Sequence, residues 1–162
     1  MNKEMHMLLE SLAACEQRIE KLRQSLDKNR PFFPFNAEVL KNLSDEQQES
    51  VDALILRYSQ SVSMIQDQIF RGIAYVEQEN LQDKSNRDKS LLMEKLGAIR
   101  SADEFGTAAV LRNKFSHHYP EDSLEQIERL NLLVKEADFV ITAFEEIVDF
   151  LKRKGFILAG CD

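Results

Sequence analysis

The sequence has few of the residues that make turns, cross-links or membrane spans. Its 162 residues include no tryptophan, five glycines, three prolines and two cysteines. Because Gly and Pro interrupt helices and are scarce here, while Leu, Glu, Lys and Gln are common, the composition favours helix throughout. No apolar run approaches the roughly 20 residues of a membrane-crossing helix. The N-terminus mixes charges at once and lacks a signal-peptide hydrophobic stretch, so we expect a cytoplasmic protein that avoids membranes.

The two cysteines, Cys15 and Cys161, do not form a pattern with chemical meaning. A reducing cytosol disfavours a disulfide between them. No cluster of histidines lies at metal-ligand spacing from either thiol. The sequence therefore predicts no metal and no cofactor.

Positive charge is in deficit, with 21 Lys and Arg against 28 Asp and Glu, a net charge of −7. That balance argues against broad binding to a nucleic-acid backbone, and we expect no DNA partner. A small basic cleft stays compatible with it, because the charges are unevenly placed. Residues 84–114 carry seven bases and four acids, a local excess of +3.

Apolar residues recur at spacings of three and four, which is typical of amphipathic helices. Two Ser-x-x-Glu/Gln patterns, at Ser44 and Ser101, indicate helix starts, and Gly97 indicates a helix end. The spacing predicts five helices, over about 3–27, 44–79, 87–96, 101 to the segment before Pro120, and 123–154. We expect an all-α, up-and-down bundle of about five helices.

The chain divides into residues 1–43 and 44–158, which we expect to form a single globular unit. The first part holds a helix with an apolar seam and a strap, 29–35, rich in Phe and Pro. The seam must be buried, either in its own bundle or against a partner chain. The strap either packs onto the bundle, the better-supported alternative, or forms an exposed patch for a partner.

Residues 112–119, Arg-Asn-Lys-Phe-Ser-His-His-Tyr, concentrate proton-transfer and anion-binding groups at the end of the fourth helix. Asn113 and His117 are four apart and share a helix face. Arg112 points about 140° away from His117 in a regular helix, so the pair does not converge there. Either the helix unwinds before Pro120, or a second copy of the chain supplies the missing half across a two-fold axis.

His117, at the negative pole of its helix, is favoured in its protonated form. An imidazolium beside a guanidinium binds an anion, and a phosphodiester fits best. This chemistry suggests metal-independent RNA cleavage. One imidazole would deprotonate the ribose 2′-OH, an acid would protonate the leaving 5′-oxygen, and Arg112 would stabilise the charged intermediate.

The spacing Arg112-x4-His117-x-Tyr119, with Asn113 next to the arginine, resembles the RX4HXY motif of HEPN domains. The stretch 96–105 before the motif also resembles that family, and the resemblance covers about residues 45–153. The chain looks like the toxin of a HEPN–MNT toxin–antitoxin pair, in which MNT denotes a minimal nucleotidyltransferase. The resemblance implies a homodimeric endoribonuclease with RNA as its substrate.

By the same resemblance, Arg112 and His117 are catalytic, and Asn113 orients the substrate phosphate or the histidine. Tyr119 takes the place of a tyrosine to which the partner nucleotidyltransferase antitoxin can add AMP, which silences the toxin. A packing anchor is an equally good interpretation of Tyr119. His118 has no assigned role, and a solvent-facing side chain is the better interpretation.

Two other functions compete with this one. A non-catalytic module of the same fold could bind a nucleotide or substrate for a minimal nucleotidyltransferase, which the overall acidity mildly favours. A purely structural helical adaptor would leave residues 112–119 unexplained.

Overall fold

A computed structural model of the protein describes residues 2–116 and 123–158. Over these residues the chain is helical and contains no strand, so the expected all-α class is confirmed. The elements, in chain order, are α1 (Lys3–Asn29), η1 (Arg30–Phe32), α2 (Ala37–Lys41), α3 (Asp45–Met64), η2 (Ile65–Ile69), α4 (Phe70–Val76), α5 (Asn86–Leu96), α6 (Ala102–Ser116) and α7 (Ser123–Arg153).

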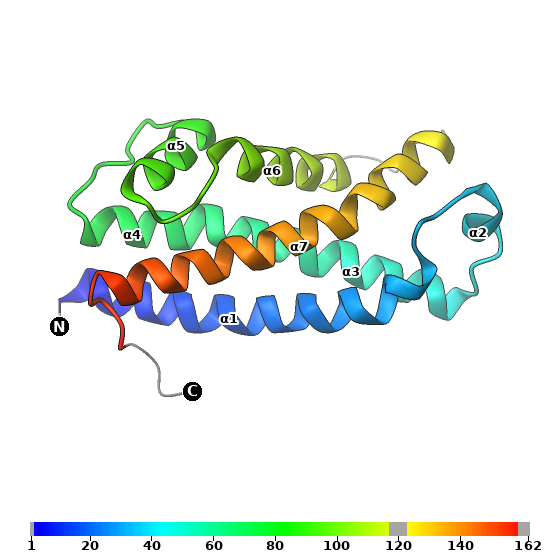
Figure 1. The fold of residues 1–162 in the computed structure, drawn as a ribbon, viewed down its shortest axis with the longest axis horizontal. Helices are drawn as coiled ribbons and strands as arrows, with labels where there is room; N and C mark the ends of the chain where they lie inside the picture. The colour runs from blue at the N-terminus through cyan, green and yellow to red at the C-terminus, as the bar shows by residue number, and fades with distance from the viewer. Residues whose placement is uncertain (1, 117–122, 159–162) are drawn as a thin grey trace.

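Long helices that follow one another in sequence run in opposite directions along an elongated bundle (Figure 1). α1 runs one way, and α3, η2 and α4 return beside it as one continuous rod. α6 then runs forward and α7 returns, while the short α5 packs at one end against α4, η2 and α6. The described helices include none that is both long and apolar enough to cross a membrane.

The apolar seam of α1 is buried within its own chain. α1 packs mainly against α3 and also contacts α4, η2 and α7. Five seam residues are buried and two others, Met5 and Leu12, are half-buried; the buried five are Leu8, Cys15, Ile19, Leu22 and Leu26. The seam is therefore a major part of the core.

The strap after α1 also packs onto the bundle. Phe35 is buried in a small apolar cluster with Val51 and Leu130, and its ring meets Phe33 edge-to-face at 4.7 Å. Asn131 of α7 accepts a hydrogen bond from Phe35 N at 2.7 Å and donates one to Phe35 O at 3.0 Å. The strap contains the short helix η1, and the one-turn α2 follows it.

The helix ends follow the local signals in the sequence. Ser44 Oγ accepts from Gln47 N, and Gln47 Oε1 accepts from Ser44 N, which completes the capping box expected there. Gly97 ends α5 in the left-handed conformation, with φ +88°. Ser101 Oγ accepts from Glu104 N at the start of α6. Local side chains therefore satisfy backbone groups that the helix ends leave open.

The second long helix differs from the expectation in one respect. The sequence predicts a regular α-helix over 44–79, but the structure has a π-helix, η2, between α3 and α4, and α4 ends at Val76. The backbone N–H of Phe70 bonds to the carbonyl of Ile65, five residues back. One extra residue is thereby accommodated in the rod, which redirects the side chains around it.

Candidate functional site

Arg112, near the C-terminal end of α6, is held by three hydrogen bonds. Its Nη1 donates to Ser63 Oγ at 2.6 Å, its Nη2 to Gln66 Oε1 at 3.1 Å, and its Nε to Asn113 Oδ1 at 3.1 Å. A guanidinium has five N–H donors, so two have no partner among the described residues. The side chain is half-buried, which leaves its planar face and remaining donors able to meet a ligand.

The π-helix supplies one of these anchors. Gln66 is the second residue of η2 and is only 2% exposed. Its Oε1 accepts the bond from Arg112, so the buried amide oxygen is satisfied. Ser63 comes from the last turn of α3, just before the π-helix. The sequence did not predict either residue as part of the site. The only local signal for them is that Gln66 follows Ile65 on an otherwise apolar helix face.

Asn113 is exposed, and its amide oxygen orients the neighbouring guanidinium. The sequence predicts that Asn113 orients a substrate phosphate or His117. Its Oδ1 accepts from Arg112 Nε, and its amide nitrogen can still donate to a ligand. The two described residues of the expected site are thus brought into direct contact.

His117, His118 and Tyr119 lie outside the described residues. The structure places Arg112 and Asn113 and says nothing of the other three. The catalytic role expected of His117 and the regulatory role expected of Tyr119 therefore stay predictions.

Tyr58 fixes the helix that carries Arg112. Its ring on α3 is fully buried, and its hydroxyl donates to the carbonyl of Ala108 at 2.6 Å, one turn before Arg112. Burial raises the pKa of Tyr58, and the nearby charge of Glu136 raises it further, whereas Arg112 lowers it. The phenol therefore stays protonated and continues to donate, which ties α6 to α3 beside the site.

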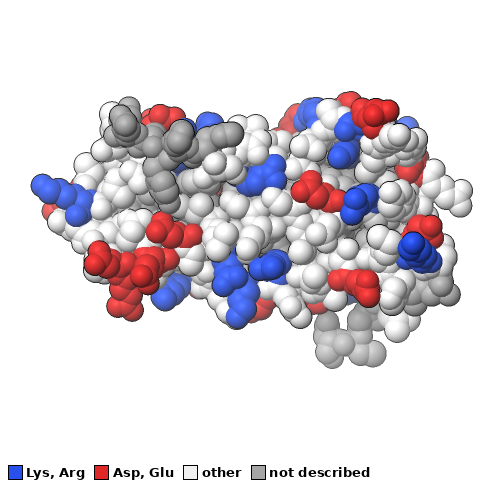
Figure 2. Space-filling model, turned by 180° about the vertical axis from the view of Figure 1, so that it is seen from behind, with Lys and Arg blue, Asp and Glu red and all other residues white. Residues whose placement is uncertain are grey.

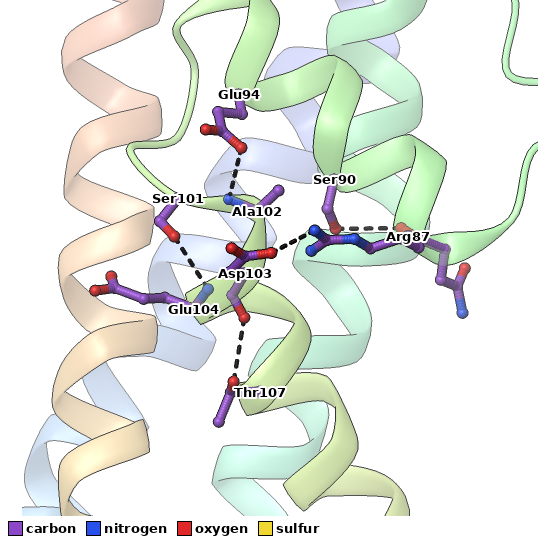
Figure 3. A network of polar contacts seen from close by, with 9 residues as sticks. Arg87, Ser90, Glu94, Ser101, Ala102, Asp103, Glu104 and Thr107 are labelled. Atoms are coloured by element: carbon purple, nitrogen blue, oxygen red, sulfur yellow. Dashed lines mark hydrogen bonds and ion pairs between the residues drawn. The ribbon is translucent and has the colours of Figure 1, made fainter.

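A cavity of about 460 Å³ opens beside the Arg112 cluster, between η2, α5 and α6. Arg112, Asn113 and Gln66 form part of its lining. On another side, Arg87 of α5 forms an ion pair with Asp103 of α6, as Figure 3 shows. The lining therefore combines apolar surface with two guanidinium groups, one of them paired with Asp103, which suits an anionic ligand of about nucleotide size.

One hydrogen bond across the junction of α5 and α6, and others within each helix, order the side of the cavity that these helices form (Figure 3). Glu94 near the end of α5 accepts from Ala102 N at 3.1 Å, and Thr107 Oγ1 donates to the carbonyl of Asp103 at 3.1 Å. Ser90, 2% exposed, donates to the carbonyl of Asn86. The parts of α5 and α6 that line the cavity are thus held in place before a ligand binds.

Cys15 has no part in this site. It is fully buried, and burial raises its thiol pKa to about 12. The thiol therefore stays neutral and unreactive at ordinary pH.

Among the described residues, no group of three or more His, Cys, Asp or Glu is placed to hold a metal ion. Comparison of the chain with protein-family models, with curated proteins and with solved structures finds no match.

Proposed function

We propose that this chain is a metal-independent, RNA-cleaving toxin with a HEPN-type site, neutralised by a partner nucleotidyltransferase antitoxin. The observation that carries the proposal is the Arg112 guanidinium, held by three hydrogen bonds beside a cavity of about 460 Å³ with two N–H donors left over. An arginine prepared in this way binds the oxygens of a phosphodiester. His117 follows five residues later and supplies a proton-transfer group.

The reaction is transfer of the phosphodiester to the adjacent ribose oxygen. An imidazole takes the proton of the 2′-OH, and the 2′-oxygen attacks the phosphorus. The bond to the 5′-oxygen breaks, and an acid donates a proton to that leaving oxygen. Arg112 binds the non-bridging oxygens, whose negative charge grows in the transition state. Because Ser63, Gln66 and Asn113 hold the guanidinium, little reorganisation is needed during the reaction.

The complete cleft is proposed to form between two copies of the chain. Arg112 and His117 diverge by about 140° on a regular helix, so one protomer does not supply both groups to one phosphate. A two-fold axis beside the ends of two α6 helices would bring the arginine of one copy near the histidine of the other.

The partner is proposed to act at Tyr119. A phosphate-bearing group at the edge of the cleft would exclude RNA by charge and volume. A minimal nucleotidyltransferase that transfers AMP to the Tyr119 hydroxyl would therefore switch the toxin off.

One experiment with two arms tests the proposal. The wild type, His117→Ala and Arg112→Lys are each expressed alone and with the partner nucleotidyltransferase, and growth, cleavage of total RNA and the mass of the Tyr119 peptide are measured. We expect cleavage to fall at least about 100-fold in both variants, since a lysine cannot keep three directed bonds. Co-expression should restore growth and add AMP to the peptide.

Equal and unchanged RNA in the wild type and His117→Ala would overturn the toxin proposal. An unmodified Tyr119 peptide with the active partner and ATP present would overturn the silencing step alone.

A non-catalytic binding module is the second candidate. Arg112 already gives three of its donors to the protein, which would also suit a guanidinium that only supports a bound nucleotide. This candidate predicts binding of RNA or nucleotide that His117→Ala leaves unchanged, with no cleavage by the wild type.

A further inference from the structure

A second, larger cavity lies on the other side of Gln66. It measures about 600 Å³ and is bounded by η2, α4, the loop after α4, and α5. Gln66 lines both this cavity and the one beside Arg112, so the two hollows adjoin through one side chain that is also bonded to Arg112. Together the two linings form a tract that runs from Arg112 toward the α4–α5 end of the bundle.

The lining of the second cavity combines an aromatic ring with cations. Tyr75 of α4 is 50% exposed, and it is the only aromatic among the exposed large hydrophobic residues that the structure describes. Arg71 is one turn earlier on the same face of α4, and Lys89 of α5 lies across the cavity. A half-exposed ring that lines a cavity together with two cations is a combination that proteins use to bind single-stranded nucleic acid, through base stacking and phosphate contact.

Charge in the tract is opposite in sign to that of the whole chain. The two linings contain four cations and two carboxylates, a net +2, although the chain carries −7; they are Arg71, Arg87, Lys89 and Arg112 against Asp67 and Asp103. Figure 2 shows basic and acidic side chains interspersed over the face opposite to that of Figure 1. A local basic tract on an acidic body directs an anionic chain to that place.

The loop after α4 gives this cavity a defined edge. Asn80 Oδ1 accepts from Gln82 N at 2.8 Å, and Leu81 between them packs against the main core. Asp67 lies on the η2 side, where its carboxylate can accept from a ribose hydroxyl or a base amino group. The cavity therefore presents groups for each part of a nucleotide.

We infer that this cavity is a substrate subsite for single-stranded RNA. A nucleotide one step beyond the two that flank the scissile phosphate stacks its base on Tyr75, and its phosphate contacts Arg71 and Lys89. The subsite deepens the proposed function and rests on it for the choice of RNA as ligand. It makes the protein prefer unpaired RNA longer than a dinucleotide, because a paired base cannot reach the ring.

Binding and cleavage are measured separately to test the subsite. Fluorescence anisotropy follows the binding of a single-stranded RNA of about ten nucleotides, a length within the range of such sites. All binding variants carry His117→Ala, which prevents turnover under the proposed mechanism. We expect Tyr75→Ala to weaken binding about tenfold and Tyr75→Phe to keep it within about twofold, because the phenylalanine ring still stacks. Arg71→Gln should weaken binding and reduce its salt dependence by about one phosphate contact.

Matched controls come from exposed residues outside both linings. Leu56→Ala removes a side chain that is 52% exposed on α3, and Lys21→Gln removes one charge from α1. Neither should change binding. In the cleavage arm, Tyr75→Ala with His117 intact should lower kcat/KM for the longer RNA about tenfold and leave that for a dinucleotide unchanged.

The outcomes separate the subsite from the catalytic proposal. The subsite is overturned if Tyr75→Ala and Arg71→Gln bind the RNA as tightly as the His117→Ala parent does. It is also overturned if that parent does not bind the RNA. Either result holds even if Arg112 and His117 cleave RNA. Weakened binding in both variants, with RNA left intact by the wild type, supports the subsite while the catalytic proposal fails. Circular dichroism of each variant confirms that its helices are intact.

Discussion

At the scale of single residues, Arg112 is informative because its neighbours determine what it can do. Three directed hydrogen bonds use up part of its donor set and fix the plane of the guanidinium. A long cationic side chain free in solvent would lose conformational entropy on binding a phosphate, and Arg112 has lost much of it on folding. The residue is thus prepared for a ligand before the ligand arrives.

Glu136 on α7 is a second residue that only its surroundings explain. It is 5% exposed and lines a cavity of about 330 Å³ with Glu104 and Lys135. Burial raises its carboxyl pKa above the ordinary 4.5; Lys135 opposes this rise and Glu104 adds to it. The folded protein therefore holds the proton of this carboxyl more strongly than the unfolded chain does.

We predict that Glu136→Gln stabilises the protein near neutral pH. Because the folded-state pKa is raised, the contribution of Glu136 to stability is complete below about 4.5 and is lost as the pH rises through the folded value. The variant should match the wild type at about pH 4 and exceed it in free energy of unfolding at about pH 7, as measured by urea titration. A loss of stability at about pH 7 that is absent at about pH 4 would instead show that the ionised carboxylate is bonded in the fold, and would contradict the prediction.

At the scale of elements, two glycines within helices have different surroundings. A Cβ at Gly72 of α4 would lie 2.8 Å from Leu8 Cδ1 and 3.3 Å from Leu8 Cβ on α1. A Cβ at Gly106 of α6 would meet only the Arg87 guanidinium, at 3.8 Å. The first glycine allows α1 and α4 to approach, and the second leaves ordinary space.

These positions make a matched pair for measurement. We expect Gly106→Ala to raise the free energy of unfolding by up to about 1 kcal/mol, because alanine is the better helix former. Gly72→Ala should lose that gain and cost about 1–3 kcal/mol, since Leu8 must move in a packed core. Thermal or urea unfolding of both variants checks the difference, and equal stabilisation by the two would contradict the close approach of α1 and α4.

At the scale of the whole molecule, the direction of the helices determines where the site lies. The alternation of long helices puts the C-terminal end of α6 beside the middle of the α3–η2–α4 rod. The Arg112 cluster therefore lies along the side of the bundle and not at its end, and the proposed second copy of the chain would approach there.

The proposed dimer makes a prediction about mixtures. Arg112→Ala and His117→Ala are each expected to be inactive, but a mixed dimer would keep one pair of Arg112 from one copy and His117 from the other. Mixing the two purified variants under exchange conditions should restore RNA cleavage to about a quarter of the wild-type rate, since about half of the dimers are mixed and each has one of two pairs. No recovery, with exchange shown by differently tagged copies, would place both groups in one protomer.

Local signals predicted most of the architecture. Both capping boxes and Gly97 lie where the helices begin and end, and the apolar spacing identified the buried side of α1. The π-helix and α2 escaped prediction, because one depends on a single extra residue within a regular apolar pattern and the other on a five-residue helix. For the site, the motif identified Arg112 and Asn113 but neither of the anchors on the other helix.

The sequence by itself determined the helices, their ends and the segment that carries the reactive side chains, because caps and apolar periodicity act between residues a few positions apart. Only the tertiary structure decided that Arg112 bonds to Ser63 and Gln66, which are 49 and 46 residues away. It also decided that Tyr75 and Lys89 border one cavity next to that cluster. The physical reason is that a hydrogen bond or a shared cavity needs atoms within a few ångströms, and for distant residues helix packing alone sets that distance.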